Sequence, residues 1–418
     1  MTKVAFLWDE SFLWGLMAWK SFGALGIDAG IVTSGDLKAG ALDSYDVLFV
    51  PGGWASDKTV ALGEEGRGAI RDFVARGGSY MGFCGGAGLA LDVDGGLALT
   101  HVSRIPTKHR VPSFSGEVVL NADEPAHPFW RGVRKPFAFN VWWPGQFHLG
   151  DGDGIKVIAS YAGPGRDFCL ADLDSSGVGK YGKWDMWENT YGINLNPNRL
   201  VGEPAIIETK FGAGRVFLSY PHLETPGSKK GNQALLNLVE YLKPKGKGKP
   251  SPPAGRYKRH KPGFYKATPD AVKASAEMLG AAREFIRFGE RNFLWYWRNS
   301  WVLQWRRGVR GVEYSMLFGL IREIAESLKA QAVLADPDAS EKVVALWERV
   351  IPFFEDAKIL LLLERLAMMN GGMSSIRSHD PEVERLRARL FSNSKRFGGE
   401  FKEILGRLDN IVLAVIIR

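Results

Sequence analysis

Apolar residues in the first half of the chain occur in short runs that alternate with segments of helical spacing. The runs predict strands at Val4–Trp8, Val47–Val50 and Ser79–Phe83, and the spacing predicts helices at Phe12–Leu25 and Gly66–Arg76. Uninterrupted apolar strands are typical of a parallel sheet that is covered on both sides. The alternation therefore predicts an α/β domain in which a parallel sheet has helices on both faces.

The second part of the chain has a different pattern. Helix start signals, in which Thr or Asp precedes a proline, occur at Thr268-Pro269, Asp336-Pro337 and Asp380-Pro381. Strand signals are nearly absent, so we expect a helical domain built as a bundle of about four or five helices. The last helix is expected to bury one stripe, formed by Phe401, Leu405, Leu408, Val412 and Val415.

A basic segment rich in proline and glycine separates the two patterns. Between Lys243 and Thr268 the chain has nine cations and no acids. Repelling like charges, together with Pro and Gly, are typical of an extended linker. We therefore expect three parts: an α/β domain at residues 1–243, a linker at 244–268 and an all-α helical domain at 269–418.

The net charge of +8 resides in this segment, because the rest of the chain has 45 cations and 46 acids. A nearly neutral remainder makes a nucleic-acid partner an unfavoured hypothesis. The first residues, Met1–Asp9, are interpreted as a strand and not as a signal peptide, and no apolar stretch reaches the ~18 residues of a membrane span. The two cysteines, Cys84 and Cys169, predict neither a disulfide framework nor a zinc site, so we expect a cytoplasmic protein.

The segment Gly82-Phe83-Cys84-Gly85-Gly86 has the pattern of a nucleophile elbow, a sharp turn between a strand and a helix. Such a turn strains the backbone of the nucleophile, and glycines two residues before and after it relieve the crowding. The helix N-terminus favours the thiolate and so is expected to lower the pKa of Cys84. A buried structural cysteine surrounded by glycines is the alternative.

A second candidate motif lies far downstream. The segment Lys210–Arg215 predicts a hairpin turn, and the strand Val216–Tyr220 that follows it ends in Pro221-His222-Leu223-Glu224. A carboxylate two residues after a histidine can orient the imidazole ring toward a nucleophile. We therefore interpret Cys84, His222 and Glu224 as a catalytic triad, with a surface-loop histidine as the alternative.

Three stretches, Asp46–Gly53, Phe73–Gly86 and Gly212–Glu224, occur in an order that resembles the class I glutamine-amidotransferase-like superfamily. Within it, the chain is most similar to the family named for the N-terminal domain of eukaryotic biotin-protein ligases. The resemblance covers residues 1–243 and implies a flavodoxin-like parallel sheet. It also implies that Cys84 is the nucleophile, His222 the base and acid, and Glu224 the group that orients His222. The N–H groups of Gly85 and Gly53 would form the oxyanion hole, and no cofactor is required.

The chain departs from glutaminases of this superfamily, which usually have a glutamine four residues after the cysteine, where this chain has Gly88. No synthase motif and no biotinyl-adenylate loop is recognisable in the sequence. We expect a hydrolase or amidotransferase-like enzyme that attacks an amide, ester or thioester carbonyl of a small molecule or peptide through a thioester intermediate. A non-catalytic module that binds a ligand or partner is the alternative.

Three tryptophans are candidates for substrate binding. Trp142 and Trp143 belong to the aromatic segment Asn140–His148, and Trp54 follows Gly53. For the aromatic segment, packing against the insertion at 100–200 is the favoured interpretation, and a substrate pocket near Cys84 is the alternative. Glu10, just after the first strand, lies where related proteins place a carboxylate beside their cysteine, although an exposed turn residue is the simpler interpretation.

No metal site is expected. The histidines lack metal-binding spacing, and the acidic stretch Asp172–Gly177 has Lys183 where a calcium loop needs its twelfth, bidentate glutamate. In the helical domain, Trp297, Trp301 and Trp305 have the spacing of one helix face. Packing in the core or at a domain interface is the default explanation of that face. A partner protein or self-association is the first alternative, and a face for a membrane surface or nucleic acid is the second.

Overall fold

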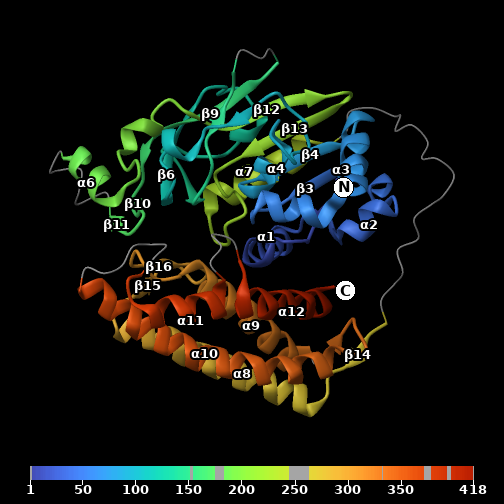
Figure 1. The fold of residues 1–418 in the computed structure, drawn as a ribbon. Coiled ribbons are helices and arrows are strands. Elements are labelled where there is room, and N and C mark those ends of the chain that lie inside the picture. The colour runs from blue at the N-terminus through green and yellow to red at the C-terminus, as the bar shows by residue number, and fades with distance from the viewer. Residues whose placement is uncertain are drawn as a thin grey trace. The chain divides into compact units, whose positions relative to one another are not determined.

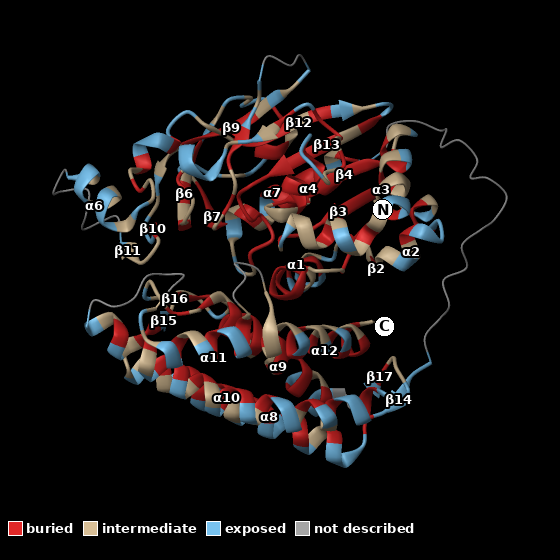
Figure 2. Ribbon diagram, in the orientation of Figure 1, coloured by how far each residue is buried: buried red, intermediate tan, exposed pale blue. Residues whose placement is uncertain are grey.

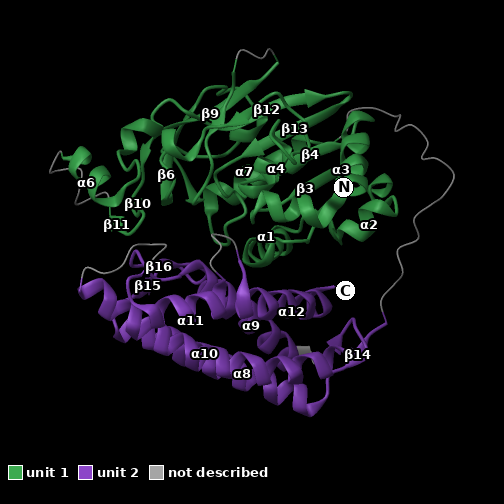
Figure 3. Ribbon diagram, viewed as in Figure 1, with its two compact units in different colours: residues 1–259 green, residues 260–418 purple. Residues whose placement is uncertain are grey.

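The computed structural model describes residues 2–150, 154–174, 183–243, 263–331, 333–370, 378–392 and 397–417. The chain divides into two compact units, residues 1–259 and 260–418, which Figure 3 shows in different colours. Most of the predicted linker, residues 244–262, lies outside the described residues. Within the described ranges, no helix is long and apolar enough to cross a membrane.

A parallel sheet forms the centre of unit 1 (Figure 1). Its strand order, β2-β1-β3-β4-β13, is the flavodoxin-like order in which the first strand lies inside the second. The predicted α/β class is confirmed. The parallel strands are β1 (Val4–Leu7), β2 (Ala29–Val32), β3 (Val47–Val50), β4 (Ser79–Phe83) and β13 (Gly214–Ser219).

Helices cover both faces of this parallel core, as alternate strand residues show. On one face, Phe6 and Phe49 pack against Phe22 of α1, with ring centroids 5.4 and 4.9 Å away. On the other face, Ala5 and Leu48 belong to a buried cluster that includes residues of α2, α3 and α4. Figure 2 shows how buried the central strands are. The helices are α1 (Phe12–Leu25), α2 (Ser34–Lys38), α3 (Ala55–Ala75), α4 (Gly85–Ala90) and α7 (Lys229–Tyr241).

Beyond β13 the same sheet continues with antiparallel strands, of which the sequence analysis predicted only the hairpin that leads into β13. The strand β12 (Pro204–Phe211) pairs with β13 across a turn at Gly212, where φ is 58°, so the predicted hairpin is confirmed. The sheet then proceeds through β9 (Lys156–Pro164) to β6 (Phe114–Ala122). The remaining strands of this region are β7 (Phe137–Trp142), β10 (Cys169–Leu170), β11 (Leu173–Asp174), β5 (Ser103–Arg104) and β8 (Phe147–His148).

Unit 2 is a set of packed helices, as predicted. Two of the three predicted start signals cap a helix: the Thr268 side chain accepts from the Ala271 N–H, and Asp380 accepts from Glu382. The helix that follows the remaining signal, Asp336-Pro337, begins two residues after Pro337 and has Asp338 at its N-cap position. All five residues of the predicted last stripe are buried. The helices are α8 (Pro269–Arg291), α9 (Val312–Gln331), α10 (Ala339–Met369), α11 (Pro381–Phe391) and α12 (Gly399–Ile416).

The prediction of one helix face for Trp297, Trp301 and Trp305 is wrong. These residues belong to an antiparallel hairpin, in which β15 (Trp295–Trp297) pairs with β16 (Leu303–Trp305). Asn299 forms its turn, because the Asn299 carboxamide accepts from the N–H groups of Trp301 and Val302 at 2.8 and 3.0 Å. Aromatic residues favour strands, and Asn favours turns, so local preference explains the hairpin. A second short pair joins β14 (Tyr265–Lys266) to β17 (Val333–Leu334).

Candidate active site

Cys84 occupies a strained turn between β4 and α4. Its backbone angles are φ 49° and ψ −105°, in a region that side-chain-bearing residues rarely adopt. A Cβ atom on Gly82 would lie 2.6 Å from the Gly86 carbonyl oxygen, and one on Gly86 would overlap the Val50 carbonyl oxygen. The glycines of the predicted elbow are therefore required by close backbone packing.

The elbow is fixed to the end of the last parallel strand. The N–H of Cys84 donates to the carbonyl oxygen of Ser219 at 2.8 Å, and Ser219 is the final residue of β13. The Cys84 sulfur lies 3.9 Å from the Trp142 carbonyl oxygen. Cys84 is partly exposed, whereas Cys169 is buried. Since the chain continues from Ser219 to His222 in three residues, the strand pairing brings the two distant motifs together.

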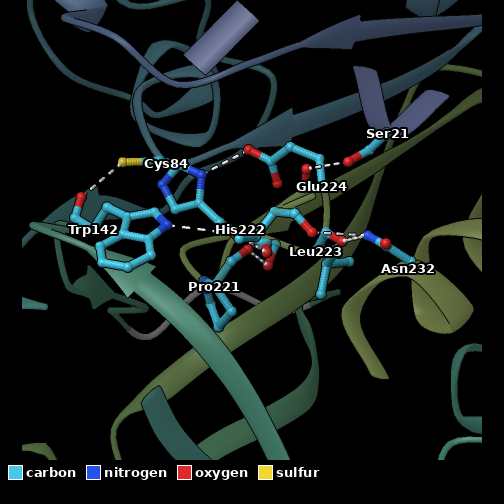
Figure 4. A network of polar contacts seen from close by, with 10 residues as sticks. Ser21, Cys84, Trp142, Pro221, His222, Leu223, Glu224 and Asn232 are labelled. Carbon is cyan, nitrogen blue, oxygen red and sulfur yellow. Dashed lines mark hydrogen bonds and ion pairs between the residues drawn. The ribbon is translucent and has the colours of Figure 1, made fainter. Parts of the chain in front are cut away.

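The imidazole of His222 lies between the side chains of Cys84 and Glu224 (Figure 4). Its Nδ1 atom is 2.6 Å from Oε1 of Glu224, and both side chains are 1% exposed. The Nε2 atom has no hydrogen-bond partner of standard geometry among the described residues. The structure thus leaves this ring nitrogen available on the side of the thiol.

Backbone contacts hold the histidine and the glutamate in place. The His222 N–H donates to the Asn140 carbonyl oxygen at 2.8 Å. The Ser21 hydroxyl donates to the Glu224 carbonyl oxygen at 2.7 Å, and the Asn232 amide donates to that of Leu223 at 2.9 Å. The segment between β13 and α7 is therefore tied to three other parts of unit 1.

The electrostatic setting of His222 favours its protonated form. Burial lowers the pKa of His222, but the negative charges of Glu224 and Cys84 and hydrogen bonds to both outweigh it and raise this pKa to about 10. The imidazolium is consequently the main species at neutral pH.

The residues predicted to form the oxyanion hole lie next to each other. Gly85 is the first residue of α4, so its N–H has no acceptor within that helix. Gly53 has φ 112°, and its carbonyl oxygen lies so close to Gly85 that a Cβ there would overlap it. Lys58 of α3, next to Gly53, holds the loop between β1 and α1: its fully buried ammonium donates to the Asp9 carbonyl oxygen at 2.8 Å and to the Ser11 hydroxyl at 2.6 Å.

The three predicted substrate-binding tryptophans have different surroundings. Trp142 is 2% exposed and lies in β7, with its carbonyl oxygen at the sulfur, while Trp143 is partly exposed with φ 51°. Trp54 is 44% exposed and precedes α3. Trp14 of α1, which the sequence analysis missed, packs against the His222 ring at a tilt, with centroids 5.2 Å apart, and its ring centroid lies 6.3 Å from that of Trp143. In sequence, Trp14 resembles any apolar helix residue.

The other sequence candidates fit less well. Glu10 has φ 53°, and a Cβ on Gly53 would overlap its carbonyl oxygen. The backbone of Glu10 therefore packs against the loop at Gly53. In the part of the chain that the structure describes, no group of three or more His, Cys, Asp or Glu side chains is arranged to hold a metal ion.

These features define a doubly wound α/β unit with a cysteine on its nucleophile elbow. No protein-family model and no curated protein sequence matches the chain. It is similar to a solved structure of PurLQS from Thermotoga maritima, with 17% identity over 58% of this chain and 99% of that chain and a TM-score of 0.39.

Two further solved structures are similar over the same share, 58%, of this chain. One is a β-galactosidase from Bacillus circulans, with 15% identity, 32% of that chain covered and a TM-score of 0.35. The other is a cytoplasmic protein of Salmonella typhimurium, with 12% identity, 100% of that chain covered and a TM-score of 0.32. Similarity at this level carries no conclusion about activity.

Proposed function

We propose that unit 1 is a class I glutamine-amidotransferase-like enzyme that hydrolyses or transfers an acyl group through a Cys84 thioester. The proposal rests on one observation: the His222 ring, hydrogen-bonded through Nδ1 to Glu224 at 2.6 Å, lies beside the thiol on a strained elbow. An orienting carboxylate, an imidazole and a nucleophile in this order make up a catalytic triad.

The chemistry proceeds in two halves. The Cys84 thiolate forms a bond from sulfur to the carbonyl carbon, and the carbonyl electron pair moves to oxygen. Collapse of this intermediate breaks the bond to the leaving amine, alcohol or thiol, which takes a proton from Nε2 of His222. Water then attacks the thioester and gives a proton to His222. Cleavage of the carbon–sulfur bond releases the acid and restores the thiolate and the imidazolium.

Glutamine is not the proposed substrate. A Cβ atom on Gly88 would meet Ala55 at an ordinary contact distance of 3.6 Å, so packing leaves room for a side chain where glutaminases usually have glutamine. The chain has none there. The likeness to the biotin-protein ligase N-terminal family and the cytoplasmic location remain predictions from the sequence. So does the partner predicted for the tryptophan-rich part of unit 2.

Alkylation by iodoacetamide tests whether Cys84 is a nucleophile. We expect Cys84 to be labelled below pH 8, while Cys169, which is 4% exposed, stays unlabelled. In a screen of amides, esters and γ-glutamyl compounds, Cys84→Ala should lower turnover at least about a thousandfold, and Cys169→Ala should leave it unchanged. Labelling of Cys84 only above pH 8.5, or equally with Cys169, would support a binding module instead. Rapid ammonia release from glutamine would contradict the exclusion of glutamine.

A further inference from the structure

Several buried polar atoms near Cys84 have no hydrogen-bond partner among the described residues. They are Nε and Nη1 of Arg110 and the hydroxyl groups of Tyr161 and Tyr220. The two tyrosines are at most 1% exposed. Buried polar groups are normally satisfied, and unpaired ones are costly, so these groups are candidates for hydrogen bonds to a ligand.

Arg110 is held in place by its backbone. The segment that carries it begins at β5, which pairs with β8. The N–H groups of Ile105 and Val111 donate to the Gln146 carbonyl and carboxamide oxygens at 3.0 and 2.8 Å. The Asn194 amide donates to the Arg110 carbonyl oxygen at 2.9 Å. The backbone that carries the Arg110 side chain is thus fixed on both sides.

The same short segment, residues 142–147, connects this arginine to the nucleophile. The Trp142 carbonyl oxygen lies 3.9 Å from the Cys84 sulfur. A Cβ on Gly145 would lie 2.5 Å from the Tyr220 hydroxyl oxygen, and Gln146 holds the arginine segment. Phe147, at the end of the segment, packs against the Tyr220 ring, with ring centroids 4.2 Å apart. Cys84, Tyr220 and Arg110 therefore border one region of unit 1.

The charges in this region are unbalanced. Burial and the neighbouring Arg104 lower the pKa of Arg110, whereas Tyr220 and Cys84 raise it. No described carboxylate is among the groups that act on Arg110. An arginine keeps its positive charge at neutral pH despite such a shift. Burial also raises the pKa of Tyr161 and Tyr220, so both hydroxyl groups remain protonated and can donate.

We propose that Arg110 binds a carboxylate of the substrate whose carbonyl group Cys84 attacks, and that the Tyr220 hydroxyl donates to the same group. This inference rests on the proposed function and specifies its substrate class: an amide other than glutamine, an ester or a thioester that carries a second, anionic carboxyl group. One guanidinium charge matches one carboxylate charge, and charge-assisted hydrogen bonds are the stronger kind.

Matched alkylating reagents test the inference without knowledge of the substrate. Iodoacetate and iodoacetamide differ in one carboxylate, and N-iodoacetylglycine and its amide form a longer pair. Each rate at Cys84 is divided by the rate with a free thiol. We expect the acid of at least one pair to be favoured about tenfold in the wild-type chain, as a charge-assisted contact provides.

Variants separate binding from structure. Arg110→Gln should abolish the preference for the acid and leave the rate with the neutral reagents within about twofold, and Arg110→Lys should retain part of the preference. The control is Arg131→Gln, because Arg131 is 72% exposed and contacts Glu240. An unchanged preference in Arg110→Gln, or an equal loss with acid and neutral reagents, would overturn the inference alone. Inertness of Cys84 to every reagent would refute the proposed function, and this inference with it.

Discussion

Each compact unit buries an acid–base pair, and the two pairs differ in what surrounds them. In unit 1, Nδ1 of His222 is 2.6 Å from Glu224, and in unit 2, Nε of Arg387 donates to Glu364 at 2.7 Å. All four residues are at most 5% exposed. By burial and distance alone, the pairs are equivalent.

Their remaining polar atoms distinguish them. Arg387 also donates to the Gly308 carbonyl oxygen at 2.7 Å and lies 3.6 Å from Glu384, so its guanidinium connects three parts of the helical unit. Among the described residues, Nε2 of His222 has no other group to bond than the thiol of the partly exposed Cys84 beside it. A buried ion pair is therefore weak evidence for a site. A ring nitrogen that faces only a thiol is much stronger evidence.

The largest effect is expected when the ion pair of unit 2, Arg387 with Glu364, is removed. Arg387→Met leaves Glu364 buried without its partner, and the free energy of unfolding should fall by about 3 kcal/mol. The control on the same helix is Arg389→Met, since Arg389 is 41% exposed and its pair with Asp356 should contribute less than about 1 kcal/mol. Denaturant unfolding measures both. Equal losses would show that the buried pair is no more important than the exposed one.

The second prediction separates the pairs by pH. Burial raises the pKa of Glu364 from the ordinary value of 4.5 to about 7, although the charge of Arg387 lowers this pKa. The folded state then binds a proton more tightly than the unfolded state, so stability is lost as pH rises from 4.5 to 7. For His222 the folded pKa of about 10 exceeds 6.5, so the stability it contributes is complete below pH 6.5 and is lost as pH rises to 10.

Two variants should remove these losses one at a time. Between pH 4.5 and 7, the wild-type chain should lose on the order of 2 kcal/mol of its free energy of unfolding that Glu364→Gln does not lose. Between pH 6.5 and 10, His222→Gln should avoid a loss of similar size. Amide hydrogen exchange at several pH values reports each unit separately. A variant that keeps the wild-type slope in its own window would contradict the assigned titration.

Much of unit 1 is predictable because its signals are local. The backbone conformation of the elbow, and that of the segment from the β13 turn to Glu224, is determined by residues only a few positions apart. The antiparallel strands beyond the β12–β13 hairpin were missed. Burial alternates along β6 from Gly116 to Asn121, but the residue types do not, because Val118, Val119 and Leu120 are all apolar.

Other features have no local signal. Arg110 and Trp14 become neighbours of the site only through tertiary contacts, and their sequence surroundings are those of an ordinary loop and an ordinary helix. The tryptophan hairpin was predicted as a helix because Trp297, Trp301 and Trp305 have a spacing of four. The turn at Asn299 overrides that spacing, and its Asn-Ser pair was the available signal.

The third prediction uses the pair of unit 1 for reactivity. Glu224→Gln can still accept a hydrogen bond from Nδ1, but it lacks the charge that raises the pKa of His222. With less imidazolium present, alkylation of Cys84 at pH 8 should slow about tenfold, equivalent to about 1.4 kcal/mol. Glu364→Gln is the matched control and should not change the rate. An equal effect of both substitutions would indicate general loosening of the fold.

The smallest expected effect concerns two glycines of α4 that sequence alone cannot tell apart. Gly86 faces the Val50 carbonyl oxygen, whereas a Cβ on Gly88 would meet its nearest neighbour at 3.6 Å. Because alanine loses less backbone entropy than glycine in a helix, Gly88→Ala should raise the free energy of unfolding by about 0.5–1 kcal/mol and leave Cys84 alkylation unchanged. Gly86→Ala should lower both stability and reactivity. If Gly88→Ala slowed alkylation as much as Gly86→Ala, the elbow would depend on the whole glycine-rich turn, and the His222 ring nitrogen that faces the thiol would not by itself explain the reactivity of Cys84.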